Sequence, residues 1–164
     1  MRRKGLTLLE LVVAVTIALI IGGTVAPILL QHLKDAKVAA TAENLTNLKV
    51  AFESFYTKNG GVISDANSDG NYIDDMYNDG WLSKLPQDAN FDYFIKKYTS
   101  GDKVAYYIEI DAKSGMEDAA KEILQRLDEK IDDGNATTGS FQYDDTNAKG
   151  FYLLYTELGN ASWH

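Results

Sequence analysis

The sequence contains no cysteine, only two prolines, and fewer basic than acidic side chains. Without cysteine, the chain can form no disulfide, use no thiol nucleophile and bind no metal through a thiolate. Its 16 basic residues stand against 24 acidic ones, which gives a formal net charge of −8 at pH 7. Proteins that bind nucleic acid directly carry an excess of basic charge instead, so we expect no direct nucleic-acid site. A length of 164 residues suits one domain of ordinary size.

The apolar residues are concentrated near the start of the chain. Residues 11–30 read LVVAVTIALIIGGTVAPILL, without a single charge. A helix of this length spans about 30 Å, the thickness of the hydrocarbon core of a bilayer. The basic residues at positions 2–4 are expected to stay cytoplasmic, so the rest of the chain would face outward. The alternative is a secretory signal peptide, but its apolar region is shorter and ends at a small-residue cleavage site.

One carboxylate interrupts the apolar segment near its start. Glu10 lies between Leu9 and Leu11. An ionised side chain at membrane depth is costly and commonly has a partner or a task. The alternative is that Glu10 lies at the cytoplasmic interface, where its side chain can reach water.

The basic cluster, Gly5, the run LTLLE at positions 6–10 and the apolar segment together resemble the class III signal of type IV pilins and their relatives. The resemblance implies that a prepilin peptidase cuts between Gly5 and Leu6 and methylates the new N-terminus. Leu6 stands where the family more often has Phe, and Thr7 matches a position that commonly holds a small hydroxyl residue. Glu10 occupies the family's glutamate position, which is implied to compensate the N-terminal amine of a neighbouring subunit during assembly. Because one helical turn separates the two positions, its own amine is also within reach.

Pro27 lies inside the same segment, shortly after Gly22 and Gly23. Proline removes a backbone hydrogen bond and bends a helix, and glycine is the weakest helix former after proline. Membrane-spanning helices tolerate both residues, so an ordinary spanning helix is the alternative. The resemblance implies a bent or melted stretch here in the filament. We therefore predict that residues 22–27 are the least regular part of the assembled helix, although they can be helical in an isolated subunit.

An amphipathic pattern follows Leu30 and stops at two glycines, Gly60 and Gly61. Apolar residues recur there at three- and four-residue steps, which predicts a helix with one buried face: Leu33, Ala36, Ala40, Leu45, Leu48, Phe52 and Phe55. A helix from Leu6 to about Thr57 would be about 78 Å long. The sequence offers no second apolar helix to cover its first half, so that half must lie in lipid or among copies of itself. This predicts a homo-oligomeric helical filament.

The segment from residue 59 to 164 is predicted to form an α+β head. Aromatic and β-branched residues favour strands at 104–110, 140–143 and 151–156, with a further candidate at 91–98. A helix is predicted at 117–131, with a capping box formed by Ser114 and Glu117 and a buried stripe of Ala120, Ile123, Leu124, Leu127 and Ile131.

The economical architecture is an antiparallel sheet that packs on the second half of the long helix. This arrangement also resembles the head of a pilin, so the resemblance implies a pilin fold. The segment GWLSKLP at 80–86 resembles one shared by major pilins and pseudopilins, and residues 130–143 resemble a pilin tail more weakly. The predicted organisation is a leader at 1–5, a transmembrane and assembly helix at 6–30, an amphipathic continuation at 31–58 and the head at 59–164.

An acidic loop of the head carries the best metal hypothesis. Residues 65–71, DANSDGN, match the first half of an EF-hand-type calcium loop, in which alternating oxygen ligands converge around a glycine turn. The twelfth position is Met76 instead of glutamate, so Asp74 or Asp75 would have to substitute. The candidate ligands are Asp65, Asn67, Asp69, Asn71, Asp74 and Asp75. A solvated acidic turn is the alternative.

Calcium would also supply a staple, because many pilins close their C-terminal region with a cysteine pair that this chain lacks. The acidic pairs Asp132-Asp133 and Asp144-Asp145 are interpreted as surface turns, with calcium binding as the alternative.

Together these patterns predict a structural subunit of a type IV pilus and no enzyme, because no catalytic constellation is evident. The filament would serve adhesion, motility or DNA uptake. Its partners would be copies of itself, the prepilin peptidase, the pilus or secretion assembly machinery and, before assembly, the cytoplasmic membrane. The alternatives are a pseudopilin of a type II secretion system and a monomeric, membrane-anchored calcium-binding module.

Overall fold

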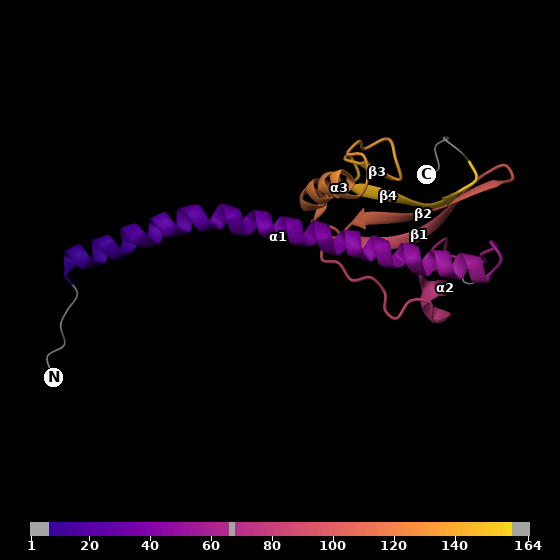
Figure 1. Ribbon diagram of the computed structural model, residues 1–164, viewed down its shortest axis with the longest axis horizontal. Coiled ribbons are helices and arrows are strands. Elements are labelled where there is room, and N and C mark those ends of the chain that lie inside the picture. The colour runs from indigo at the N-terminus through magenta and orange to yellow at the C-terminus, as the bar shows by residue number, and fades with distance from the viewer. Residues whose placement is uncertain (1–6, 66–67, 159–164) are drawn as a thin grey trace. The chain divides into compact units, whose positions relative to one another are not determined.

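The computed structural model describes residues 7–65 and 68–158, and the chain divides after Lys37 into two compact units. Helix α1 (Leu8–Lys58) makes up almost all of the described part of the first unit and continues into the second (Figure 1). The second unit contains the other described helices and the strands. The predicted long helix is therefore confirmed over the described residues, and Leu6 lies outside them.

The second unit is built around a four-stranded antiparallel sheet with the spatial order β1-β2-β4-β3. Its strands are β1 (Phe91–Ser100), β2 (Lys103–Ala112), β3 (Phe141–Asp144) and β4 (Lys149–Thr156). Helix α2 (Tyr72–Asn78) precedes β1 in the chain, and helix α3 (Glu117–Ile131) connects β2 to β3. The strands and α3 occur where the residue pattern predicts them. The α+β, pilin-like arrangement of a long helix on an antiparallel sheet is confirmed.

The C-terminal part of α1 buries one face against this sheet. Its buried residues keep to one side of the helix and are Val38, Thr41, Leu45, Leu48, Phe52 and Phe55. The predicted stripe is confirmed from Leu45 onward but is wrong for Leu33, Ala36 and Ala40, which are exposed. Leu33 and Ala36 belong to the first unit, where no other described element covers them. Thr41 can replace an apolar residue in the core because its hydroxyl donates to the Asp88 carboxylate, 3.0 Å away.

Helix α3 packs on the same core, and its buried stripe is confirmed for Ala120, Ile123, Leu124 and Leu127. The last predicted member, Ile131, is only partly buried because it ends the helix. Gly150 of β4 lets the helix approach the sheet closely. A Cβ atom at this position would lie 2.8 Å from Ile110 Cγ1 and 2.8 Å from Leu124 Cδ2. Both distances are shorter than a van der Waals contact, so a larger residue would push α3 away from the sheet.

The opposite face of the sheet carries a charged cluster around the buried Glu109 of β2. Its carboxylate lies 3.0 Å from Lys149 Nζ and 3.1 Å from Lys96 Nζ, and Lys149 also pairs with Asp111 at 2.8 Å. Burial alone would raise the pKa of Glu109, but the hydrogen bonds from Lys149 and Lys96 outweigh it, so the pKa is lowered. Glu109 therefore ties β2 to both of its neighbouring strands.

One local prediction in the head is wrong, and one short helix was not predicted. The capping box of α3 is wrong, because a turn from Lys113 to Met116 precedes the helix and makes Met116 the N-cap. The Glu117 carboxylate instead accepts from the backbone N–H of Gly115, 3.1 Å away. Helix α2 was not predicted, because its acidic, asparagine-rich surroundings are typical of a turn; its N-cap is Asn71, whose side chain accepts from the Ile73 N–H.

Candidate functional site

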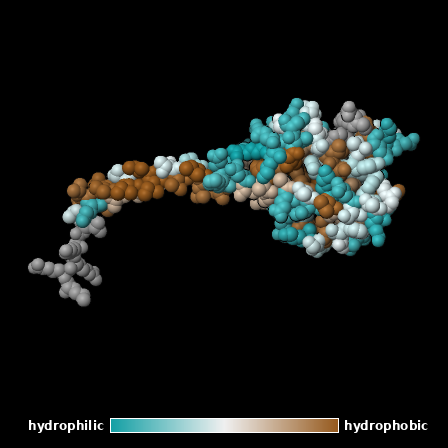
Figure 2. Space-filling view, viewed as in Figure 1, coloured by the Kyte–Doolittle hydropathy of each residue, from teal (hydrophilic) through white to brown (hydrophobic). Residues whose placement is uncertain are grey.

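The first unit presents an apolar surface that no other described element covers. Every described residue from 7 to 37 is exposed, and Leu8, Ile20 and Leu29 keep 81%, 61% and 57% of their surfaces accessible. Figure 2 shows this surface as a brown covering of the N-terminal part of α1, whereas the second unit is mainly teal and white. By length and composition, α1 can cross a membrane. Exposed apolar surface of this extent marks a membrane or protein contact.

The start of α1 is closed by a reciprocal capping box. The Glu10 carboxylate accepts from the backbone N–H of Thr7 at 2.8 Å and from its hydroxyl at 2.9 Å, while the Glu10 N–H donates to the Thr7 hydroxyl at 3.3 Å. This pattern satisfies backbone N–H groups that the first turn of a helix leaves without partners. The sequence predicts the charge of Glu10 but not this local role, although Thr7-x-x-Glu10 is a capping-box signature in front of an apolar run.

The structure describes only some of the residues that the remaining N-terminal predictions concern. Gly5 and Leu6, the predicted cleavage and methylation positions, lie outside the described residues. Pro27 lies inside α1, and residues 22–27 are helical in this single subunit, which the prediction allows. The Thr24 hydroxyl donates to the carbonyls of Ile20 and Ile21, both at 3.1 Å. Whether this stretch is the least regular part of an assembled helix stays a prediction.

The predicted calcium loop is placed in part, because Asn67 lies outside the described residues. One Asp65 oxygen accepts from the Gly70 N–H at 2.7 Å, and one Asp69 oxygen accepts from the Asn71 N–H at 2.7 Å. The Asn71 side-chain oxygen is engaged by the N–H groups of Ile73 and Ile95, both at 3.2 Å, which joins α2 to β1. Asp74 and Asp75 lie in the first turn of α2. Calcium binding by this loop stays a prediction.

The acidic pair Asp144-Asp145 takes part in a turn between β3 and β4. Asp144 accepts from the Thr146 N–H at 2.7 Å and from the Asn147 side-chain amide at 2.6 Å. These two bonds lower the pKa of the Asp144 carboxyl, with the side-chain bond the stronger cause. The observed hydrogen bonds are those of the predicted surface turn.

The comparisons with known proteins identify the N-terminal segment. Residues 1–26 match the family model described as the prokaryotic N-terminal methylation motif. The search of curated proteins and the search of solved structures returned no match.

The match makes the N-terminal segment a class III signal, the signal of type IV pilins and pseudopilins. It confirms the resemblance inferred from the residues around Gly5 and Glu10. The motif implies processing by a prepilin peptidase and, at a general level, assembly into pilus-type polymers. A class III signal and the exposed apolar part of α1 are both consistent with anchoring in the membrane before assembly.

Proposed function

We propose that this chain is a structural subunit of a type IV pilus. It is held in the cytoplasmic membrane as a single-pass protein with its head outward, cut between Gly5 and Leu6, methylated at Leu6 and polymerised through its N-terminal helices. The observation that carries the proposal is the apolar surface of residues 8–30, most of which lies inside the segment matched by the methylation motif and which no other described element covers. Copies of the same helix would provide that cover.

Glu10 sets the register of assembly in this proposal. A subunit that leaves the membrane brings a positive N-terminal amine into an apolar bundle, where an unpaired charge is strongly unfavourable. The Glu10 carboxylate can pair with the amine of a neighbouring copy, because its bonds to Thr7 leave further lone pairs available. The second unit, which carries most of the acidic residues, would then form the filament surface for adhesion, motility or DNA uptake.

Electron microscopy of cells that express the chain with its assembly machinery tests this function. Glu10→Gln keeps an oxygen that can accept the capping bonds but removes the charge, whereas Thr7→Val removes the capping hydroxyl and keeps the charge. We expect surface filaments from the wild-type chain, fewer filaments from Thr7→Val and none from Glu10→Gln. Membrane fractions must contain all three proteins in similar amounts.

The other outcomes identify the competing functions. A cut and methylated wild-type chain that forms no surface filament, but is required for protein secretion, would support a pseudopilin of a type II secretion system. An uncut monomer in the membrane would support an anchored calcium-binding module. Normal filaments from Glu10→Gln would contradict the role of the charge and leave helix capping as the role of Glu10.

A further inference from the structure

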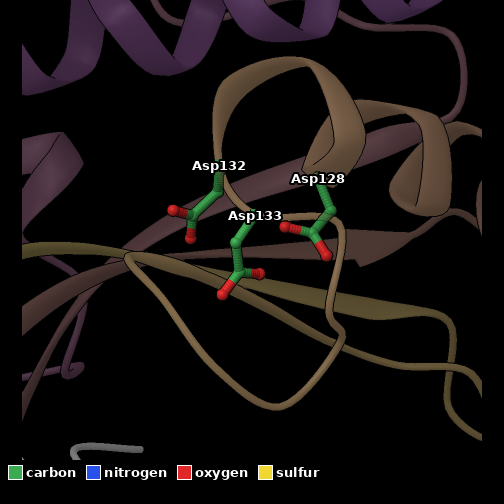
Figure 3. A group of neighbouring side chains, drawn as sticks. All are labelled: Asp128, Asp132 and Asp133. Carbon is green, nitrogen blue, oxygen red and sulfur yellow. The ribbon is translucent and has the colours of Figure 1, made fainter.

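Three aspartates meet where α3 ends and the loop to β3 begins. Asp128 lies in the last turn of α3, Asp132 is its C-cap and Asp133 is the next residue. One carboxylate oxygen from each residue lies within 4.8 Å of the others. Figure 3 shows the three side chains leaving this turn above the loop that leads to β3. The apolar stripe of α3 includes Leu124, one turn before Asp128, so Asp128 extends from the core-facing side of the helix.

Asp128 is the unusual member of this group, because its side chain has no access to solvent and no hydrogen-bond partner. The residue is 0% exposed, and neither carboxylate oxygen accepts a bond of normal geometry from any residue that the structure describes. Burial, then the charges of Asp133 and Asp132, raise its pKa to about 6, which the backbone N–H of Gly134 offsets only in part. A buried carboxylate without a donor is destabilising unless another group compensates it.

The other two aspartates are held in place by the loop itself. Asp132 Oδ2 accepts from the Phe141 N–H at 2.7 Å, and a Cβ atom at Gly139 would lie 2.0 Å from that same oxygen. Gly139, with φ +83°, therefore leaves the space that the Asp132 carboxylate occupies.

Asp133 is fixed by two further bonds of the same loop. Its oxygens accept from the Asn135 N–H at 2.9 Å and the Thr138 hydroxyl at 2.7 Å. Each of these engaged oxygens retains a further lone pair, so the three carboxylates form a preorganised set of oxygen donors.

We propose that Asp128, Asp132 and Asp133 bind one hard divalent cation, for which calcium is the best fit. Calcium ligands lie 2.3–2.6 Å from the ion, so two ligands on opposite sides of it are about 4.6–5.2 Å apart. The spacing of the three oxygens satisfies this limit. Magnesium draws its ligands closer and demands an octahedron. Asp133 is exposed, so water can complete the coordination and the ion can exchange with solvent.

The ion would compensate the charge of Asp128 and join the end of α3 to the loop before β3. It is a separate site from the Asp65–Asp75 loop, and it does not depend on whether the chain forms a pilus. A turn that is stabilised only by its own hydrogen bonds explains Asp132 and Asp133 but leaves the two Asp128 oxygens without partners.

The test uses the full chain, purified in detergent micelles and freed of metal with EDTA. Thermal unfolding is measured with and without about 10 mM CaCl₂, a concentration that saturates sites of the affinity found in extracellular modules. We expect calcium to raise the Tm of the wild-type protein by about 5 °C, and the same concentration of magnesium to raise it less. Isothermal titration with CaCl₂ gives the stoichiometry and affinity.

Variants assign the site. Asp128→Asn removes the buried charge. Asp133→Asn changes an exposed ligand, so it provides a second test of the site if Asp128→Asn folds poorly. Both should lose at least tenfold in calcium affinity and most of the Tm rise. Asp145→Asn is the matched control on a neighbouring acidic turn and should keep the full rise in Tm. Asp69→Asn changes the separate Asp65–Asp75 loop, so it should keep the part of the Tm rise that Asp128→Asn abolishes. No calcium-dependent rise in the wild-type protein, or an equal rise in a folded Asp128→Asn or Asp133→Asn variant, overturns the proposal.

Discussion

Glu109 provides the sharpest test of how charge stabilises the head. Its side chain is 8% exposed, whereas Lys96 and Lys149 are 38% and 33% exposed. Glu109→Gln preserves the shape of the side chain but removes the charge that both ammonium groups face at 3.0–3.1 Å. Lys149 keeps its bond to Asp111 at 2.8 Å, so Lys96 loses the most.

The size of the effect follows from this geometry. Breaking one partner of a fully buried ion pair costs about 3–5 kcal/mol, and an exposed pair contributes about 0–1 kcal/mol. Glu109 is buried but its two lysines are about one third exposed and can regain water. The expected loss lies between these limits, at about 2 kcal/mol in the free energy of unfolding near pH 7. The matched control is Asp92→Asn, which removes an exposed partner of Lys113 at 3.5 Å and should change the stability by less than about 0.5 kcal/mol.

The loss must also depend on pH in a definite direction. Because the folded protein lowers the pKa of Glu109 below its ordinary value of 4.5, the ionised carboxylate contributes stability above about pH 4.5. That contribution disappears as the pH falls through the lowered pKa of the folded state. Urea unfolding of the full chain in detergent should therefore separate wild type from Glu109→Gln near pH 7 and bring them together in acid. A difference below about 0.5 kcal/mol, or one that stays constant with pH, would refute the reasoning.

Two further predictions concern the packing of the head, and thermal or urea unfolding of the full chain measures both. Phe52→Ala should lower the free energy of unfolding by about 3–5 kcal/mol, because Phe52 is 1% exposed in the core. The control Val50→Ala, on the exposed side of the same helix, should lower it by less than about 0.5 kcal/mol. Equal losses would contradict the packing of α1 on the sheet. Gly150→Ala should cost about 1–3 kcal/mol because its Cβ would lie 2.8 Å from Ile110 and Leu124, and an unchanged stability would show that α3 can move away without loss.

Patterns that repeat over many residues predicted the elements of the fold. The apolar stripe of α3 predicted a helix at 117–131, which is where the structure has it. The predicted strand at 104–110 lies inside β2, which extends beyond it at both ends. A stripe repeated over four turns averages out local exceptions. The predictions failed where the structure depends on a single residue or on contacts from another part of the chain. Ser114 forms no capping box because a turn before the helix moves the N-cap to Met116, and the α1 stripe begins at Val38 because the sheet, not the sequence period, decides where the helix is covered.

The two candidate sites, the N-terminal methylation motif and the Asp128, Asp132 and Asp133 group, also differ in how far the sequence predicts them. The methylation motif is contiguous, so the residues around Gly5 and Glu10 can be identified without a structure. The burial of Asp128 depends on how the loop after α3 folds over it, which the order of the residues does not reveal. One signal was available: an aspartate four residues after Leu124 falls on the apolar face of an otherwise regular amphipathic helix. The sequence also offers the neighbouring pair Asp132-Asp133, but only the structure shows that the Asp128 carboxylate is buried beside them without a hydrogen-bond partner.

The central claim is that this chain polymerises after its leader has been removed. Intact-mass spectrometry of subunits from sheared, purified surface filaments tests that claim most directly. We predict a subunit that lacks Met1 to Gly5 and carries one methyl group on Leu6. Filaments built of the uncut chain, or a cut chain that is found only in the membrane and never in a filament, would contradict it.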